Sequence, residues 1–214
     1  MARALLDELA PPQRLALAYA PRRARAATLA LLALDARLAA ILRRRGEPVL
    51  VQLRLAWWRD MLAKEPQAWP RGDAVLDLLR EWRGPAALAA LVDGWEALLA
   101  DELAASEIDA FASGRGSAFA QLAFELGCAP EIAEAGGRRW ALADLAANLA
   151  DPAERAAAVA SAVALPPRPR LPRELRPLAI LDALAARSLA RGGAPLLDGF
   201  GAGLLAVRLG ITGR

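Results

Sequence analysis

The stretch LLALDARLAAILRRRGEPVLVQLRLAWWRDML, residues 31–62, decides the fold class because it encodes two consecutive helices. In its first half, leucine and isoleucine recur at i, i+3 and i+4 spacing, which places one stripe of a helix against a core. The stripe consists of Leu31, Leu34, Leu38, Ile41 and Leu42. Gly46 can end this helix, and Pro48 suits the first turn of the next one. We therefore predict a helix over about 21–45 and a second one that carries WWRD.

The two adjacent tryptophans of WWRD point about 100° apart on a helix, so they cannot both face one core. We assign Trp57 to the bundle interior, since it shares a stripe with Leu50, Leu53 and Met61. Trp58 lies on the stripe of Arg54, Leu55 and Leu62, and we place it at an inter-helix seam or an exposed edge. We expect Arg59 and Asp60 in solvent, with Asp60 paired to Lys64 at i+4.

The rest of the chain has the composition of a helical globular protein. Its 214 residues are 56% hydrophobic and 24% charged, alanine and leucine dominate, and β-branched residues are scarce. Proline and glycine divide the chain into about nine helical segments, without a repeat or a clear strand. A proline-arginine connector, PPRPRLPRELRP, occupies residues 166–177. The prediction is an all-α, single-domain bundle over residues 1–214.

Several kinds of chemistry are excluded by residues that the chain lacks. It has no histidine, which rules out histidine-dependent triads, proton relays and histidine metal sites. It has one cysteine, Cys128, so neither an intrachain disulfide nor a cysteine zinc cluster can form. We expect a packed thiol at this position, where the chain leaves a helix after Gly127.

The charge balance is weakly basic, with 27 basic and 24 acidic residues. The sequence pI of about 9.9 mostly reflects how late arginine titrates. We therefore expect no nucleic-acid partner. No uncharged apolar run reaches the roughly 18 residues of a membrane span, and the N-terminus contains acids and a proline pair where a signal peptide is apolar. These features favour a cytoplasmic protein, with peripheral contact to a membrane left open.

The remaining site chemistry is that of carboxylates with a hard cation or arginines with an anion. Asp73 and Asp77 form a D-x-x-x-D pattern that Glu81 extends, but Asp73 follows Gly72 as an N-cap does. We interpret this set as a helix cap and a solvated face. The arginine run 43–45 can grip a phosphate, although its place in a last helical turn favours interaction with the helix dipole.

A second polar set has helical spacing: Asp144, Asn148 and Asp151 lie at i, i+4 and i+7. The set is interpreted first as a solvated stripe opposite Leu142, Leu145 and Leu149. The alternative is that these three residues form a residual polar site.

The order of these segments resembles that of the squalene/phytoene synthase family, all-α enzymes that join two prenyl diphosphates. Residues 31–62 look like the front half of a divergent branch that reads approximately YAFN…EP…IRLQWWRDAL. Three later segments follow in the order of that branch: LVDGWEALLADEL (91–103), FASGRGSAFAQLAFELG (111–127) and LPRELRPLAILDALAARSL (171–189). The resemblance covers most of the chain and implies an isoprenoid synthase fold. Its docking or family-signature positions are Glu47, Pro48, Arg54, Trp57, Trp58, Arg59 and Asp60.

Active members of the family carry two aspartate-rich motifs whose magnesium ions hold the substrate diphosphates. In this chain the first motif corresponds to Ala39, Ala40 and Arg43, and the second to Asn148 and Pro152. Two apolar residues, a cation, an amide and a proline thus stand where carboxylates are needed. The resemblance implies that both magnesium-diphosphate motifs have been lost.

The resemblance therefore implies a non-catalytic binding or assembly factor without a cofactor, as in the branch that includes an assembly factor for respiratory complex I. Its expected partner is a protein, and a lipid or prenyl chain is a further candidate; the inner face of a membrane is a possible place of action. The alternative is a prenyl diphosphate-binding or prenyl-transferring enzyme that uses Mg²⁺ at Asp144, Asn148 and Asp151. An open apolar cavity favours lipid binding, whereas a filled interior favours a scaffold.

Overall fold

A computed structural model describes residues 2–44 and 47–213, and this part of the chain contains helices and connecting segments without a strand. The α-helices are α1 (Ala2–Glu8), α2 (Pro11–Ala18), α3 (Arg22–Arg43), α4 (Pro48–Ala63), α5 (Ala74–Leu79), α6 (Ala89–Ala97), α7 (Ala105–Glu125), α8 (Glu131–Asn148), α9 (Pro152–Ser161), α10 (Arg176–Leu189) and α11 (Phe200–Thr212). Short 3₁₀ helices cover Pro66–Ala68, Pro85–Leu88, Ala162–Ala164 and Arg173–Leu175. The all-α prediction is confirmed.

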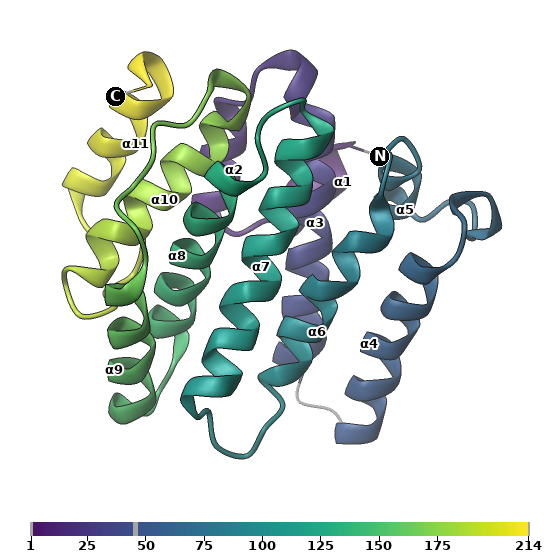
Figure 1. The fold of residues 1–214 in the computed structure, drawn as a ribbon, viewed down its shortest axis with the longest axis horizontal. Coiled ribbons are helices and arrows are strands. Elements are labelled where there is room, and N and C mark those ends of the chain that lie inside the picture. The colour runs from purple at the N-terminus through teal and green to yellow at the C-terminus, as the bar shows by residue number, and fades with distance from the viewer. Residues whose placement is uncertain (1, 45–46, 214) are drawn as a thin grey trace.

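The long helices lie side by side, with α4 at one edge of the molecule and α11 at the other (Figure 1). In the centre, α7 packs between α6 and α8, and α8 packs on α10. Behind these helices, α3 contacts α4, α5, α6 and α7. No helix in the described part of the chain is both long enough and apolar enough to cross a membrane.

Helix α3 buries the face that its sequence predicts. Leu31, Leu34 and Leu38 are fully buried, and Ile41 and Leu42 pack partly buried against the core. The helix ends at Arg43, within two residues of the predicted end; Arg45, at that end, lies outside the described residues. One acid, Asp35, sits on this buried face, and its partners define the candidate site.

Glycines let α6, α7 and α8 approach closely. A Cβ at Gly114 would collide with the carbonyl oxygen of Ala90, and a Cβ at Gly137 would lie 3.0 Å from the Cα of Gly116. Since real Cβ atoms are not found this close, both helix pairs depend on these glycines. The close packing of α7 on its neighbours fixes the position of Arg115, which follows Gly114 directly.

The assignment of Trp57 to the bundle interior was wrong, whereas Trp58 lies at the seam between α3 and α4, one of the two places expected for it. Trp58 is 5% exposed and packs inward with Val51, Leu55 and Leu62, whereas Trp57 is 40% exposed. The reason is that α4 lies at the edge of the bundle and has a covered face on one side only. The leucines that share the Trp57 stripe face outward as well.

The cap prediction at Asp73 is confirmed. Its carboxylate accepts the backbone N–H groups of Val75 (2.9 Å) and Leu76 (3.0 Å) at the start of α5. Asp77 lies within 3.4 Å of Arg80, three residues further along the helix. Asp73 also accepts from Arg37 on α3 at 2.7 Å, so these acids are occupied by a helix cap and by ion pairs.

Candidate functional site

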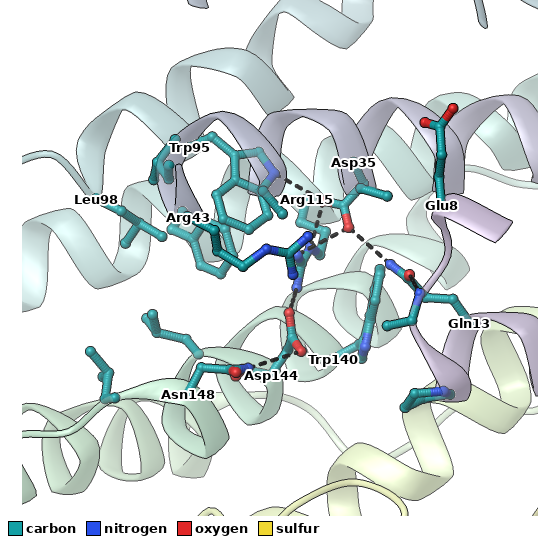
Figure 2. Close-up of a pocket in the computed structure, with 18 residues that line it drawn as sticks. Glu8, Gln13, Asp35, Arg43, Trp95, Leu98, Arg115, Trp140, Asp144 and Asn148 are labelled. Atoms are coloured by element: carbon teal, nitrogen blue, oxygen red, sulfur yellow. Dashed lines mark hydrogen bonds and ion pairs between the residues drawn. The ribbon is translucent and has the colours of Figure 1, made fainter. Parts of the chain in front are cut away.

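A cavity of about 340 Å³ opens between α3, α6, α7, α8 and the turn that joins α1 to α2 (Figure 2). Its exposed rim includes Glu8, Ala10, Arg43 and Asn148. The interior is lined by aromatic and aliphatic side chains around a group of buried polar ones. The interior residues are Pro12, Gln13, Asp35, Ala36, Ala39, Leu42, Trp95, Leu98, Phe111, Arg115, Trp140, Asp144, Leu145 and Leu149.

Asp35 accepts four hydrogen bonds in the cavity wall. The Nε and Nη2 atoms of Arg115 donate to its two oxygens at 3.1 Å each, forming a bidentate pair. The indole Nε1 of Trp95 donates at 2.9 Å, and the amide Nε2 of Gln13 donates at 3.2 Å. The carboxylate thus has two donors on each oxygen, which satisfies it without water.

Arg115 links this carboxylate to a second one. Its Nη1 donates to Asp144 at 3.0 Å, from α7 to α8. The rings of Trp140, Phe111 and Trp95 surround the guanidinium, with centroids 4.1, 4.7 and 5.2 Å from its central carbon. Aromatic faces stabilise a cation in this position. We call Asp35, Arg115 and Asp144 the triad; with both acids ionised it carries a net charge of −1.

Burial raises the pKa of Asp35 above its ordinary value. The positive charge of Arg115 acts against this rise, and the nearby Asp144 charge adds to it. The hydrogen bonds from Trp95 and Arg115 also favour the ionised form. The ion pair therefore opposes the effect of burial on the pKa of this carboxylate without reversing it.

The polar set at the end of α8 is divided between two roles. Asp144 faces the cavity with its side chain 32% exposed, and Asn148 lies one turn further on, donating to the Asp144 backbone carbonyl at 2.7 Å. Asp151 instead caps α9, accepting the backbone N–H groups of Ala153 (2.6 Å) and Glu154 (3.2 Å). The structure brings Asp144 and Asn148 together at the cavity and places Asp151 outside it.

Some positions of the two family motifs line the cavity, and others lie outside it. Ala39 and Arg43 line the cavity from α3, across from Asn148 on α8. Ala40 faces the neighbouring groove between α3 and α4, and Pro152 begins α9 outside the cavity lining. Arg43 forms no hydrogen bond or ion pair with a described residue. Within the described part of the chain it is therefore an unpaired cation at the cavity rim.

The ionisable groups at this site are mostly engaged with one another. Within residues 2–44 and 47–213, no group of three or more carboxylate or cysteine side chains is placed to hold a metal ion. Asp35 is saturated with donors, and one oxygen of Asp144 is taken by Arg115. Cys128 lines a separate hollow, and burial raises the pKa of its thiol. The cavity offers apolar walls, one unpaired cation and an acceptor at Asp144.

The WWRD segment lies away from this cavity. Arg59 stays partly exposed, as expected, but it also bridges to α6 by donating to Asp93 at 2.8 Å and to Glu96. Asp60 forms no ion pair with Lys64, since Lys64 lies beyond the end of α4 with an extended backbone. Glu47 precedes the first turn of α4, which begins at Pro48.

The central polar residues of the site were not predicted from the sequence. In the sequence Asp35 only interrupts an apolar run, and Arg115 is one residue of the FASGRGSAF segment. A lone acid on a buried helical face needs a buried partner, and an arginine between two helix-packing glycines is its natural candidate. Gln13, Trp95 and Trp140 carry no comparable signal, because their contacts depend on how the helices are arranged.

Comparisons of the chain with protein-family models, with curated proteins and with solved structures found no match.

Proposed function

We propose that this chain is a non-catalytic binding protein that holds a short amphipathic chain, of prenyl or acyl type, in its central cavity. The observation that carries the proposal is an open 340 Å³ cavity with mainly apolar walls and a rim cation, Arg43, that has no partner among the described residues. Ligand sites are typically concave and largely apolar, with a few placed polar groups that fix orientation.

The size of the cavity limits the ligand. An apolar cavity of about 150 Å³ accommodates one benzene molecule. A cavity of 340 Å³ is a little more than twice as large, and so has room for about 14 non-hydrogen atoms. A chain of ten to fifteen carbons fits this estimate when its polar end lies at the rim.

The polar groups determine how such a chain would lie. Leu42, Leu98 and Leu149 line the walls near the rim, while the triad occupies the inner wall with its hydrogen bonds satisfied by protein donors. A carboxylate, phosphate or hydroxyl head group at the rim can accept hydrogen bonds from Arg43, and a hydroxyl can also donate to Asp144. The resemblance to prenyl synthases independently favours a prenyl chain.

The alternative is a prenyl-transferring enzyme with an altered site, and the contacts favour it less. The first motif presents Ala39 and Arg43 to the cavity, and Asp144 already pairs with Arg115. Asp151, one of the three residues assigned to an altered site, caps α9 and does not line the cavity. An account of diphosphate departure needs carboxylates that are available to a cation, and the cavity-lining residues do not supply a pair of them.

Binding of farnesol, followed by calorimetry and thermal unfolding, tests the proposal. At a concentration one hundred times Kd, a ligand stabilises the folded protein by about 2.7 kcal/mol. For a chain of this size that corresponds to a rise in Tm of about 5–10 °C. Ala39→Phe fills the cavity and should abolish both signals. Ala40→Phe adds the same volume one residue away, in the neighbouring groove, and should retain them.

Two results would count against the proposal. Farnesol binding that survives in Ala39→Phe would place the ligand elsewhere. Stabilisation by farnesyl diphosphate that requires Mg²⁺, together with its turnover, would favour the enzyme instead.

A further inference from the structure

The outward face of α4 is apolar although nothing in the described structure covers it. Val49, Leu50, Leu53 and Trp57 are 61%, 46%, 60% and 40% exposed. Their spacing of three and four residues puts them on one side of the helix, opposite the buried Leu55 and Trp58. Figure 1 shows α4 at the edge of the molecule, so this side faces away from the bundle.

Three arginines flank this apolar face. Arg43 and Arg44 end α3 just before α4 begins, and Arg54 projects from α4 itself; all three are exposed and line the groove between the two helices. None of them forms a hydrogen bond or ion pair with a described residue. We call these arginines, together with Val49, Leu50, Leu53 and Trp57, the α4 platform.

Acids near the platform do not neutralise it. Glu8 lines the same groove, but its carboxylate is bonded to Arg37 at 2.9 Å. Glu47 precedes α4, and Asp60 lies beyond Trp57 toward the other end of the helix. Three cations without a partner among the described residues therefore line the groove beside the apolar residues. Of the two exposed acids nearby, Glu8 is engaged by Arg37 and Glu47 precedes the first turn of α4.

The opposite edge of the molecule provides an internal comparison. Helix α11 also exposes four large apolar residues at helical spacing: Phe200, Leu204, Val207 and Ile211. Its nearby arginines are engaged, since Arg176 donates to the carbonyl of Gly210 at 2.9 Å and Arg208 has a partner of its own. Both edges of the molecule thus expose apolar side chains. In the described part of the chain, arginines without a partner accompany them at the α4 platform.

We propose that the α4 platform docks on an anionic lipid bilayer, with its apolar side chains inserted at the interface and its arginines against lipid phosphates. Tryptophan and aliphatic side chains bordered by arginine match the layered polarity of a bilayer surface. Each arginine held near an anionic surface raises the affinity about fivefold.

The position of Arg43 favours a bilayer over an acidic protein as the occupant. Arg43 lines both the platform groove and the rim of the central cavity. A bilayer seated on the platform therefore lies next to the opening through which an apolar chain would enter. A water-insoluble ligand needs such a route, and a protein bound at the same place would cover it.

Trp57 provides a direct reporter of docking. The chain has six tryptophans, and the other five are at most 8% exposed. Transfer of Trp57 into the interface should shift the fluorescence emission to shorter wavelength, and brominated lipid chains should quench it. A tryptophan that stays in water shows neither change.

Vesicle sedimentation and this fluorescence signal test the proposal with phosphatidylcholine vesicles that contain or lack phosphatidylserine. Binding should be at least about tenfold stronger to the anionic vesicles and should weaken as salt is added. The double variant Arg44→Glu/Arg54→Glu should lose it, and Leu53→Glu should weaken it by about tenfold or more. The matched variant Leu204→Glu on α11 should bind like the wild type.

Each contrary outcome overturns the proposal. Equal affinity for both vesicle types would show that the arginines do not contribute to docking. Loss of vesicle binding in Leu204→Glu but not in Leu53→Glu would show that α11 is the docking surface. Absence of vesicle binding, combined with self-association that Leu53→Glu abolishes, would make the platform an interface between copies of the chain. Ala39→Phe should still bind vesicles, so failure of cavity binding and failure of docking are distinguishable.

Discussion

The molecule contains two buried ion networks of arginine and aspartate, which lie in different surroundings. The triad places one arginine between two acids and forms part of a cavity wall. The second network places Asp182, on α10, between Arg139 from α8 and Arg168 from the connector before α10. Arg168 donates to Asp182 at 2.7 Å, and Arg139 also donates to the backbone carbonyl of Pro166. We call it the connector network.

The difference between the networks lies in what surrounds them. The connector network ties an irregular segment to two helices and lines none of the described cavities. The triad joins α3 and α8 to α7, which packs on both of them, yet it has a cavity beside it and one half-buried member, Asp144. A buried ion pair is weak evidence for stability. The position of the triad beside an open cavity is the reason why we propose a binding site there.

Removing the central cation of the triad should have the largest effect. Arg115→Met leaves Asp35 buried and close to a second acid, which we expect to lower the free energy of unfolding by about 3–5 kcal/mol. Urea unfolding followed by circular dichroism measures this loss. A loss below about 1 kcal/mol would mean that water or a repositioned donor replaces the guanidinium.

Removing the central acid of the connector network should cost somewhat less. Asp182→Asn keeps an acceptor but leaves the buried Arg139 without a counter-charge, and we expect a loss of about 3 kcal/mol. The affinity for farnesol, measured by calorimetry on the folded variant, should be unchanged. A weaker affinity would show that the two networks are coupled.

Substitutions of the outer residues of the two networks, Asp144 and Arg168, should distinguish an effect on ligand binding from an effect on stability. Asp144→Asn and Arg168→Gln each remove one partly exposed charge, so each should cost about 1 kcal/mol or less of unfolding free energy. We expect Asp144→Asn alone to change the affinity for farnesol, because only Asp144 lines the cavity. Equal affinities in the two variants would contradict the assignment of the site.

The smallest effect concerns pH. Since burial raises the pKa of Asp35 in the folded state, the folded protein holds the proton more tightly than the unfolded chain does. The free energy of unfolding contributed by this group should therefore be highest at low pH and fall as pH rises through the folded-state pKa. Urea unfolding from about pH 4 to about pH 8 should show wild type losing stability relative to Asp35→Asn. A relative gain would mean that the Arg115 charge outweighs burial.

The sequence predicted helices better than it predicted which faces are covered. The buried stripe of α3 and the cap at Asp73 follow from local spacing, which depends on residues a few positions apart. Trp57 was wrongly placed in the interior because periodicity defines two faces of α4 without saying which one meets the bundle. That choice depends on α4 lying at an edge, which is a property of the tertiary arrangement.

Four residues singled out from the sequence lie at the candidate site, although the sequence did not predict the cavity. Asp144, Asn148, Ala39 and Arg43 all line the cavity. The partners that give Asp144 its role are distant in sequence: Arg115 lies 29 positions away from it and 80 positions from Asp35. Helical spacing says nothing about pairings at such separations.

The central claim is that the cavity beside the triad holds a short amphipathic chain, and a crystal structure with bromine-labelled dodecanoic acid tests it most directly. We expect anomalous density for the terminal bromine inside the cavity, among Phe111, Trp140 and Ala36, with the carboxylate near Arg43. Bromine density at the outer face of α4 or α11, with the cavity unfilled by the ligand, would contradict it.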